Sequence, residues 1–323
     1  MGGAYIGMID EVKGCKKGVT VKREHSSKSL SLFIAGAQKA GTTSLLHYLR
    51  QHGAIVGHKQ REFGFFARDD QYEHGYDHIY DDYFTSGHSS NVAFLAKSVA
   101  VMFIKEAARR LHGHNPSCKV LTVLRDPVER AYSAYWYMRQ QGWETESTFE
   151  DALSLEDARL RRMGELARHC SYVDRGLYSP QLKHLYSLFG RENVLSVSFD
   201  CLTSEPQEVC SEVFHWIGLC DAEVDPQRSH NQGRQPVFPS IQVLLRSFKE
   251  SRMFDRLVSV AESISPALVG NNLLRSVEGL NKVVLKKPPM REETRAQLAE
   301  CFYEDVRETE RLTDICTDDW LDS

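Results

Sequence analysis

The stretch LSLFIAGAQKAGTT, residues 30–43, decides the fold of this chain. Its apolar run over 30–35 has the length of a buried β-strand. A turn bounded by Gly36 and Gly41 follows, and leucines then recur at helical spacing over 42–52. The stretch therefore predicts a strand, a turn and a helix in succession. Such a unit binds anions, because the free amides at a helix N-terminus face the ligand.

The turn nearly matches the P-loop of nucleoside triphosphate-binding proteins, Gly-x-x-x-x-Gly-Lys-Ser/Thr. Thr42 stands where the loop lysine belongs, and Lys39 lies inside the turn instead. In a P-loop that lysine serves the terminal phosphates and the next hydroxyl binds Mg²⁺, so the difference argues against the usual metal-dependent chemistry. A glycine turn without a ligand is the alternative, but the strand–turn–helix context favours a phosphate site.

The remaining chain alternates strands with helices. Strands are predicted over 54–56, 92–95, 119–124 and 193–199, and helices over 103–111, 127–141, 179–189 and 206–217. The C-terminal third is expected to be helical, with Pro288 and Pro289 separating two helical stretches. This order predicts an α/β fold: a central parallel sheet with a P-loop-like turn, flanking helices on both faces and a helical C-terminal part.

Composition is ordinary for a globular protein of 323 residues, with 41% hydrophobic and 26% charged residues. Lys plus Arg is 40 and Asp plus Glu is 44, which gives a net charge of −4 and argues against general nucleic-acid binding. The apolar runs fall short of the roughly 20 residues of a membrane span. Eight scattered cysteines without a C-x-x-C pair favour reduced thiols in a cytoplasm and no metal site. Residues 1–28 are predicted to be a flexible arm, and the oligomeric state is left open.

A second chemical element is LRDPVERAYS, residues 124–133. Asp126 can cap the helix that follows, Pro127 suits its first position, and Glu129 completes a capping box. Arg125 ends a strand and Ser133 lies about two turns into the helix, so both could hold a second phosphate. Equally, Arg125 could pair with a local carboxylate and Ser133 could be a helix-surface hydroxyl.

Together, the segments 38–43 and 124–133 resemble the two cofactor signatures of sulfotransferases that use 3′-phosphoadenylyl sulfate (PAPS). The resemblance is greatest to the heparan-sulfate type domain and its bacterial small-molecule relatives; it covers roughly residues 30–235, with a similar helical end near 288–321. It implies a sulfotransferase domain over 29–323, with Lys39 on the bridging and transferred sulfuryl oxygens. It places Arg125 and Ser133 on the 3′-phosphate. The implied phosphosulfate loop consists of Gln38, Lys39, Ala40, Gly41, Thr42 and Thr43.

Further segments carry the rest of the resemblance. REFGFF, residues 61–66, is similar to a Glu-x-x-Phe-Phe motif whose glutamate is the catalytic base, which implies Glu62. Lys97 precedes Ser98 as in the step where a second lysine approaches acceptor and sulfate. NQGR, residues 231–234, resembles a late loop closing over the nucleotide, which implies Gly233 and Arg234 as cofactor contacts.

The assignment of the catalytic base has alternatives. Without the resemblance, Glu62 reads as a surface carboxylate near Lys59 and Arg61. His58 and His230 are alternative bases, each expected to be structural instead.

Several positions depart from the family pattern. Gly64 stands where the family often has histidine, and Ala96 and Val99 replace an acidic residue and a proline around Lys97. Gln232 replaces a lysine of the late loop, and the cysteine pair that braces this loop in the glycan enzymes is absent before it. These departures indicate a preserved donor site and a diverged acceptor site.

The segment DDQYEHGYDHIYDDYF, residues 69–84, is acidic and rich in tyrosine. It suits a neutral or cationic acceptor held by carboxylates and ring faces, for example an alkaloid bearing an amine or guanidinium. The favoured alternative is an amphipathic helix, because the tyrosines at 72, 76, 80 and 83 recur at helical spacing and can pack while the acids face solvent.

These observations favour transfer of a sulfuryl group from PAPS to a hydroxyl or nitrogen of a small-molecule acceptor, leaving adenosine 3′,5′-bisphosphate. A sulfuryl group in transfer carries less negative charge than a phosphoryl group, so lysines can stabilise it without a metal. The alternatives are a sulfotransferase acting on a carbohydrate, a P-loop kinase, and a non-catalytic nucleotide-binding protein.

Overall fold

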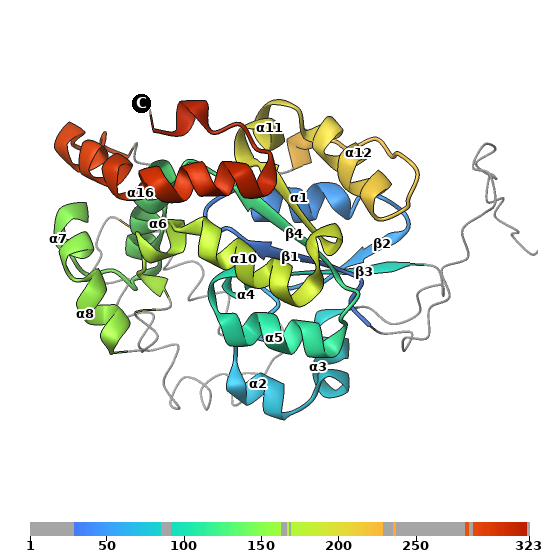
Figure 1. Cartoon of the computed structure of the whole chain (residues 1–323). Coiled ribbons are helices and arrows are strands. Elements are labelled where there is room, and N and C mark those ends of the chain that lie inside the picture. The colour runs from blue at the N-terminus through green and yellow to red at the C-terminus, as the bar shows by residue number, and fades with distance from the viewer. Residues whose placement is uncertain are drawn as a thin grey trace, which may run out of the picture.

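The centre of the molecule is a five-stranded parallel sheet with strand order β2-β3-β1-β4-β5 (Figure 1). The computed structural model describes residues 29–84, 92–162, 167, 169–228, 235–236, 282–283 and 287–321. The strands of the sheet are β1 (Leu32–Gly36), β2 (Ile55–Gly57), β3 (Ala93–Lys97), β4 (Lys119–Leu124) and β5 (Val194–Ser198). A two-residue antiparallel pair joins β6 (Gln235–Pro236) to β7 (Lys282–Val283).

Helices cover both faces of the sheet, as the sequence predicts. On one face α1 contacts α12, and on the other α10 packs against α4 and α5 (Figure 1). The helices are α1 (Thr42–Leu49), α2 (Asp69–Glu73), α3 (Tyr76–Tyr83), α4 (Ala100–Phe103), α5 (Lys105–His114), α6 (Pro127–Gln141), α7 (Phe149–Ser154), α8 (Glu156–Arg161), α10 (Tyr178–Phe189), α11 (Phe199–Ser204), α12 (Pro206–Trp216) and α16 (Glu292–Thr313). Short 3₁₀ turns are η1 (Asp174–Gly176), η2 (Arg191–Asn193), η3 (Pro226–Arg228) and η5 (Asp318–Trp320).

The core lies between these helices and the sheet. Every residue of β1 and β3 is buried, because each strand has a neighbour on both sides and helices on both faces. That burial explains why β1 is apolar throughout and why β3 is apolar up to Lys97. Since all five strands are parallel, their carboxyl ends meet at one edge of the sheet, where open α/β sheets bind ligands.

Helix α6 begins and ends where the sequence predicts. The Asp126 carboxylate accepts hydrogen bonds from the amides of Val128 at 2.8 Å and Glu129 at 3.4 Å, and Gly142 closes the helix with φ of 73°. The Glu129 carboxylate, expected to complete a capping box, faces the guanidinium groups of Arg125 and Arg295. The cap is therefore made by Asp126, and Glu129 links this helix to α16.

Other elements differ from the prediction in detail. The single helix expected over 103–111 is two helices, α4 and α5, because Ile104 between them has an extended backbone. Helix α16 follows Pro288 and Pro289 as expected, whereas the earlier helical stretch and the arm over 1–28 lie outside the described residues. Within the described ranges, no helix combines the length and apolar character needed to cross a bilayer.

Candidate functional site

The predicted anion-binding turn is present at the carboxyl end of β1. Lys39 and Gly41 both have left-handed backbones, with φ of 68° and 82°, and they turn the chain into α1. A Cβ atom on Gly41 would lie 3.1 Å from the ring of Phe199, so this position favours glycine for space as well as conformation. Thr42 begins α1 and is buried. The first amides of α1 have no partner within the helix and can face an anion.

The Lys39 side chain lies over an aromatic ring. Its Nζ is 4.3 Å from the ring centroid of Tyr137, a residue of α6. Burial, and then the positive charges of Lys287, Arg61 and Arg125, lower the pKa of Lys39 to about 8. The pKa is lowered because each cause penalises the ammonium, so the site favours the arrival of a negative group.

The second predicted anion site lies beside the first. Arg125 directly follows β4, and its Nη1 donates to the carbonyl oxygen of Lys39 at 3.3 Å. Ser133 is buried on α6, and its Oγ accepts from Lys287 Nζ at 3.4 Å. Arg125 also has the local carboxylate partner considered above, since Glu129 lies 3.6 Å away. The fold therefore brings both sequence motifs to one place.

Two residues of this cluster could not be found by motif. Lys287 directly precedes Pro288, whose carbonyl oxygen accepts from the Tyr132 hydroxyl at 2.8 Å, and this contact holds the segment on α6. Tyr137 follows Ser133 by one helical turn, and that spacing was the available signal. Lys287 gives no comparable signal, because about 150 residues separate it from Ser133.

A cavity of about 340 Å³ adjoins Arg125. The guanidinium carbon of Arg125 lies 4.7 Å from the ring centroid of Phe199, which forms part of the wall. An aromatic face beside a cation can stack a nucleotide base. The lining residues are Arg125, Asp126, Glu129, Phe199, Asp200, Asp319 and Trp320.

The two predicted catalytic residues outside the turn form an ion pair. Lys97 Nζ donates to Glu62 Oε1, and the Val99 amide donates to Glu62 Oε2 at 3.1 Å. The Lys97 side chain is 1% exposed, whereas that of Glu62 is 40% exposed. The buried Lys97 ammonium thus holds a Glu62 carboxylate that reaches solvent. Glu62 is therefore not the unpaired surface carboxylate of the alternative interpretation.

A buried arginine is connected to this ion pair through the backbone of Val99. Arg175 Nη1 donates to the Val99 carbonyl oxygen at 3.3 Å, so the Val99 residue connects Arg175 to Glu62. Burial, and then Arg130, lower the pKa of Arg175 to about 9.

The two histidines named as alternative bases differ in what the structure shows of them. His58 is fully buried, and burial, then Lys97 and Arg50, lower its pKa to about 3. Within the described ranges, neither ring nitrogen has a hydrogen-bond partner. His58 is thus a neutral imidazole without solvent access. His230, like Gly233 and Arg234 of the late loop, lies outside the described residues.

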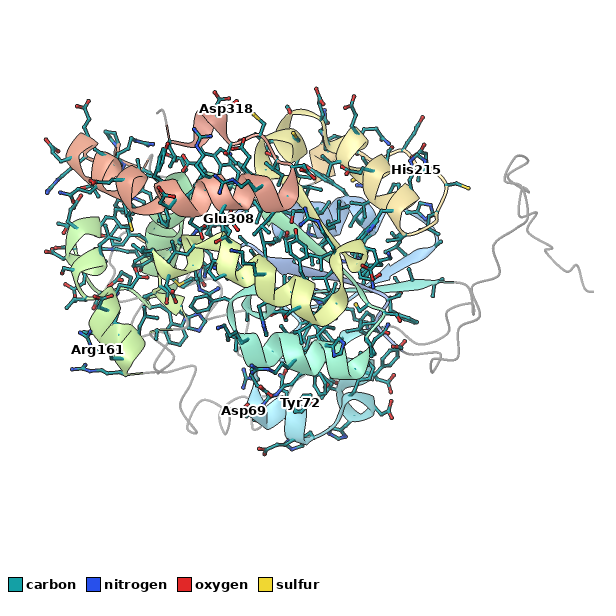
Figure 2. All side chains as sticks on the ribbon, in the orientation of Figure 1. Asp69, Tyr72, Arg161, His215, Glu308 and Asp318 are labelled. Carbon is teal, nitrogen blue, oxygen red and sulfur yellow. The ribbon has the colours of Figure 1, made fainter. Side chains whose placement is uncertain are left out.

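Three tyrosines of the acidic segment pack as the amphipathic interpretation predicts, but the single helix expected there is two helices, α2 and α3, because the chain turns at Gly75, whose φ is 84°. Tyr80 and Tyr83 of α3 are buried, and Tyr76 lies partly buried against the core. Tyr72 is exposed, but the guanidinium of Arg110 covers its ring at 4.4 Å and pairs with Asp69 at 2.7 Å. Figure 2 shows Asp69 and Tyr72 on α2, at the opposite end of the view from Asp318.

Within the described part of the chain, no group of three or more histidine, cysteine or carboxylate side chains could hold a metal ion.

Comparison with known proteins agrees with this geometry. A family model described as "Sulfotransferase domain" matches residues 30–232. The bifunctional heparan sulfate N-deacetylase/N-sulfotransferase 1 of Xenopus tropicalis is 24% identical over 64% of this chain and 24% of its own length. The corresponding human protein 3 is 28% identical over 58% of this chain and 22% of its own length. The chain thus spans about a quarter of these relatives. The crystal structure of a sulfotransferase from Alicyclobacillus acidocaldarius shares the fold, with a TM-score of 0.64, 24% identity, and coverage of 90% of this chain and 98% of that one.

Proposed function

Because the chain belongs to the sulfotransferase domain family, we propose that it transfers a sulfuryl group from PAPS to a hydroxyl or nitrogen of a small-molecule acceptor. The observation that carries this proposal is the hydrogen bond from Arg125 to the Lys39 carbonyl oxygen. It joins two cationic sites of different motifs, and a donor with phosphate groups at both ends of an adenosine needs such a pair.

The donor would span the two sites. Its 5′-phosphosulfate would lie on the turn, against Lys39 and the first amides of α1. Its 3′-phosphate would lie between Arg125, Ser133 and Lys287. These residues lie close together, since Lys287 Nζ donates to Ser133 Oγ and the charge of Arg125 acts on Lys287. The Phe199 ring beside Arg125 offers a stacking surface for adenine.

The transfer step would take place at Glu62. As the acceptor oxygen or nitrogen attacks sulfur, a new bond to sulfur forms and the bond from sulfur to the bridging phosphate oxygen breaks. Glu62 would accept the acceptor's proton, and the electron pair of the broken bond would remain on adenosine 3′,5′-bisphosphate. Lys97, paired with Glu62, would shift toward the sulfuryl oxygens together with Lys39.

A small acceptor agrees with the partial exposure of Glu62. The burial of Tyr80 and Tyr83 removes the ring faces that motivated a cationic acceptor, so we propose a nucleophilic hydroxyl or amine without assigning its charge. The scattered cysteines support a cytoplasmic location.

Calorimetry with three nucleotides tests the donor. We expect adenosine 3′,5′-bisphosphate to bind, adenosine 5′-phosphate to bind more weakly, and ATP with Mg²⁺ to bind weakly or not at all. Tight binding of ATP with Mg²⁺ alone would favour a kinase instead. A sulfate-transfer assay with labelled PAPS over phenols, amines and sugars then tests the reaction, and donor binding without transfer to any class would favour a non-catalytic protein.

A further inference from the structure

Tyr137 is a feature of the site that the donor-binding scheme does not explain. It follows Ser133 by one turn of α6, so both side chains lie on the same face of that helix. Two cations share its ring: Lys39 Nζ lies 4.3 Å and Arg61 Cζ 5.3 Å from the centroid. Lys39 comes from the turn after β1 and Arg61 from the segment after β2. One ring therefore receives positive groups from two separate parts of the chain.

In the protein without donor, some contact has to keep the Lys39 side chain in the site against the repulsion of its neighbours. Its ammonium is half-buried, and the charges acting on it are those of Lys287, Arg61 and Arg125, all positive. Repulsion of this kind drives a flexible lysine toward solvent. The face of an aromatic ring attracts an ammonium, and does so more strongly where water is excluded. The Tyr137 ring thus opposes the repulsion at the atom that the donor requires.

We propose that Tyr137 is a positioning residue for Lys39. Its ring face holds the ammonium over the turn before the donor arrives and keeps it there while the phosphosulfate is bound. The ring holds Lys39, because Lys39 Nζ lies over its face, whereas the hydroxyl is hydrogen-bonded with the Arg61 side chain. The inference rests on the proposed function for its consequence in turnover, but the contact between Tyr137 and Lys39 can be tested without a donor.

A matched pair of variants separates ring from hydroxyl. Tyr137→Phe keeps the aromatic face, and Tyr137→Leu removes it. In donor binding followed by calorimetry, we expect the Phe variant to stay within about twofold of the wild type and the Leu variant to weaken binding about tenfold, within the range of a desolvated cation–π contact. Tyr303→Leu on α16, which replaces a tyrosine that is 49% exposed, is the control and should bind normally.

Two further measurements exclude a merely structural effect. In a Lys39→Ala background, Tyr137→Leu should cause no further loss of donor affinity, because the interacting partner is gone. In the ligand-free protein, NMR titration of ¹³C-methylated lysines should show a lower pKa for Lys39 in Tyr137→Leu than in Tyr137→Phe, since the ring favours the charged form.

The inference is overturned if the Phe variant loses as much affinity as the Leu variant, if the Leu effect persists without Lys39, or if the Lys39 pKa is unchanged or raised in the Leu variant. A wild-type protein that binds no adenosine bisphosphate would contradict the proposed function alone, because the NMR titration still reports on the Tyr137–Lys39 contact.

Discussion

Arg125 Nη1 and the carbonyl oxygen of Lys39 are joined by a hydrogen bond of 3.3 Å, although 86 positions separate the two residues in sequence. The bond connects the end of β4 to the tip of the turn that follows β1, and β1 and β4 are neighbours in the sheet. The same guanidinium therefore supports the turn and is available to a phosphate.

Replacement of Arg125 should affect both ends of the donor. We expect Arg125→Ala to weaken the binding of adenosine 3′,5′-bisphosphate by about 1.5–3 kcal/mol in calorimetry, which is the range for hydrogen bonds to charged groups. The binding of adenosine 5′-phosphate should weaken less, because this nucleotide has no 3′-phosphate and is affected only through the lost support of the turn. Arg109→Ala, at an exposed arginine of α5, is the control. Equal losses for the two nucleotides would contradict a 3′-phosphate clamp.

Lys287 should contribute to the same phosphate. Its Nζ lies 3.4 Å from Ser133 Oγ, and burial followed by the charge of Arg125 lowers its pKa. We expect Lys287→Ala to weaken the bisphosphate by about 1.5–3 kcal/mol while leaving adenosine 5′-phosphate almost unchanged. Arg291→Ala, four residues further on and 65% exposed, serves as the control. An unchanged affinity for the bisphosphate would remove Lys287 from the site.

Donor affinity should depend on pH through Lys39. In the protein without donor, the pKa of Lys39 is lowered to about 8, so the ammonium form predominates below that pH and is lost above it. Because an anion binds the charged form, affinity should be constant near pH 7 and fall by up to about tenfold per pH unit above pH 8. Lys39→Arg should flatten this dependence, since a guanidinium stays charged. A fall that persists in Lys39→Arg would assign the titration to another group.

Glu62→Gln should separate chemistry from binding. The amide can still accept from the Val99 amide but cannot take a proton, so we expect transfer to slow by about 10²–10⁴-fold with bisphosphate affinity unchanged. Single-turnover transfer from labelled PAPS measures the rate. Glu106→Gln, an exposed residue of α5, should retain full activity. Turnover within tenfold of the wild type in Glu62→Gln would exclude this residue as the base.

His58 should make the fold sensitive to mild acid. Burial, then Lys97 and Arg50, lower its pKa from 6.5 to about 3. The unfolded chain therefore binds a proton below pH 6.5 that the folded chain does not, and stability falls with pH in that window. At pH 5.5 the loss is about 1.4 kcal/mol relative to pH 7.5. Urea unfolding at both values should show this loss in wild type and in the exposed-site control His78→Ala, but not in His58→Leu. An equal loss in His58→Leu would place the acid sensitivity elsewhere.

Much of the donor side could be predicted from sequence, because its signals are local. The turn over 36–41 and the capped helix at Pro127 are each encoded by neighbouring residues, and the helix has the bounds 127–141 that the sequence predicts. Their meeting at one edge follows from the parallel sheet, in which strand ends coincide.

The remaining features depend on contacts between distant segments. The ion pair of Glu62 with Lys97 crosses 35 positions, and Lys287 reaches Ser133 across 154. Neither separation has a periodicity that sequence inspection could detect. The tyrosine spacing over 72–83 was ambiguous for another reason, since rings that pack in a core and rings that bind a ligand follow the same helical pattern.

The strand order has one consequence for engineering. With β1 between β3 and β4, the residues proposed to bind the nucleotide follow β1 and β4, whereas Glu62 and Lys97 come from the half of the sheet that contains β2 and β3. Helices and side chains also join the halves, since α10 packs against α4 and α5, and Arg61 lies over the ring of Tyr137. A chimera that replaces residues 63–84 and keeps Arg61 would therefore change the surroundings of Glu62 while leaving the proposed donor contacts of Lys39 in place.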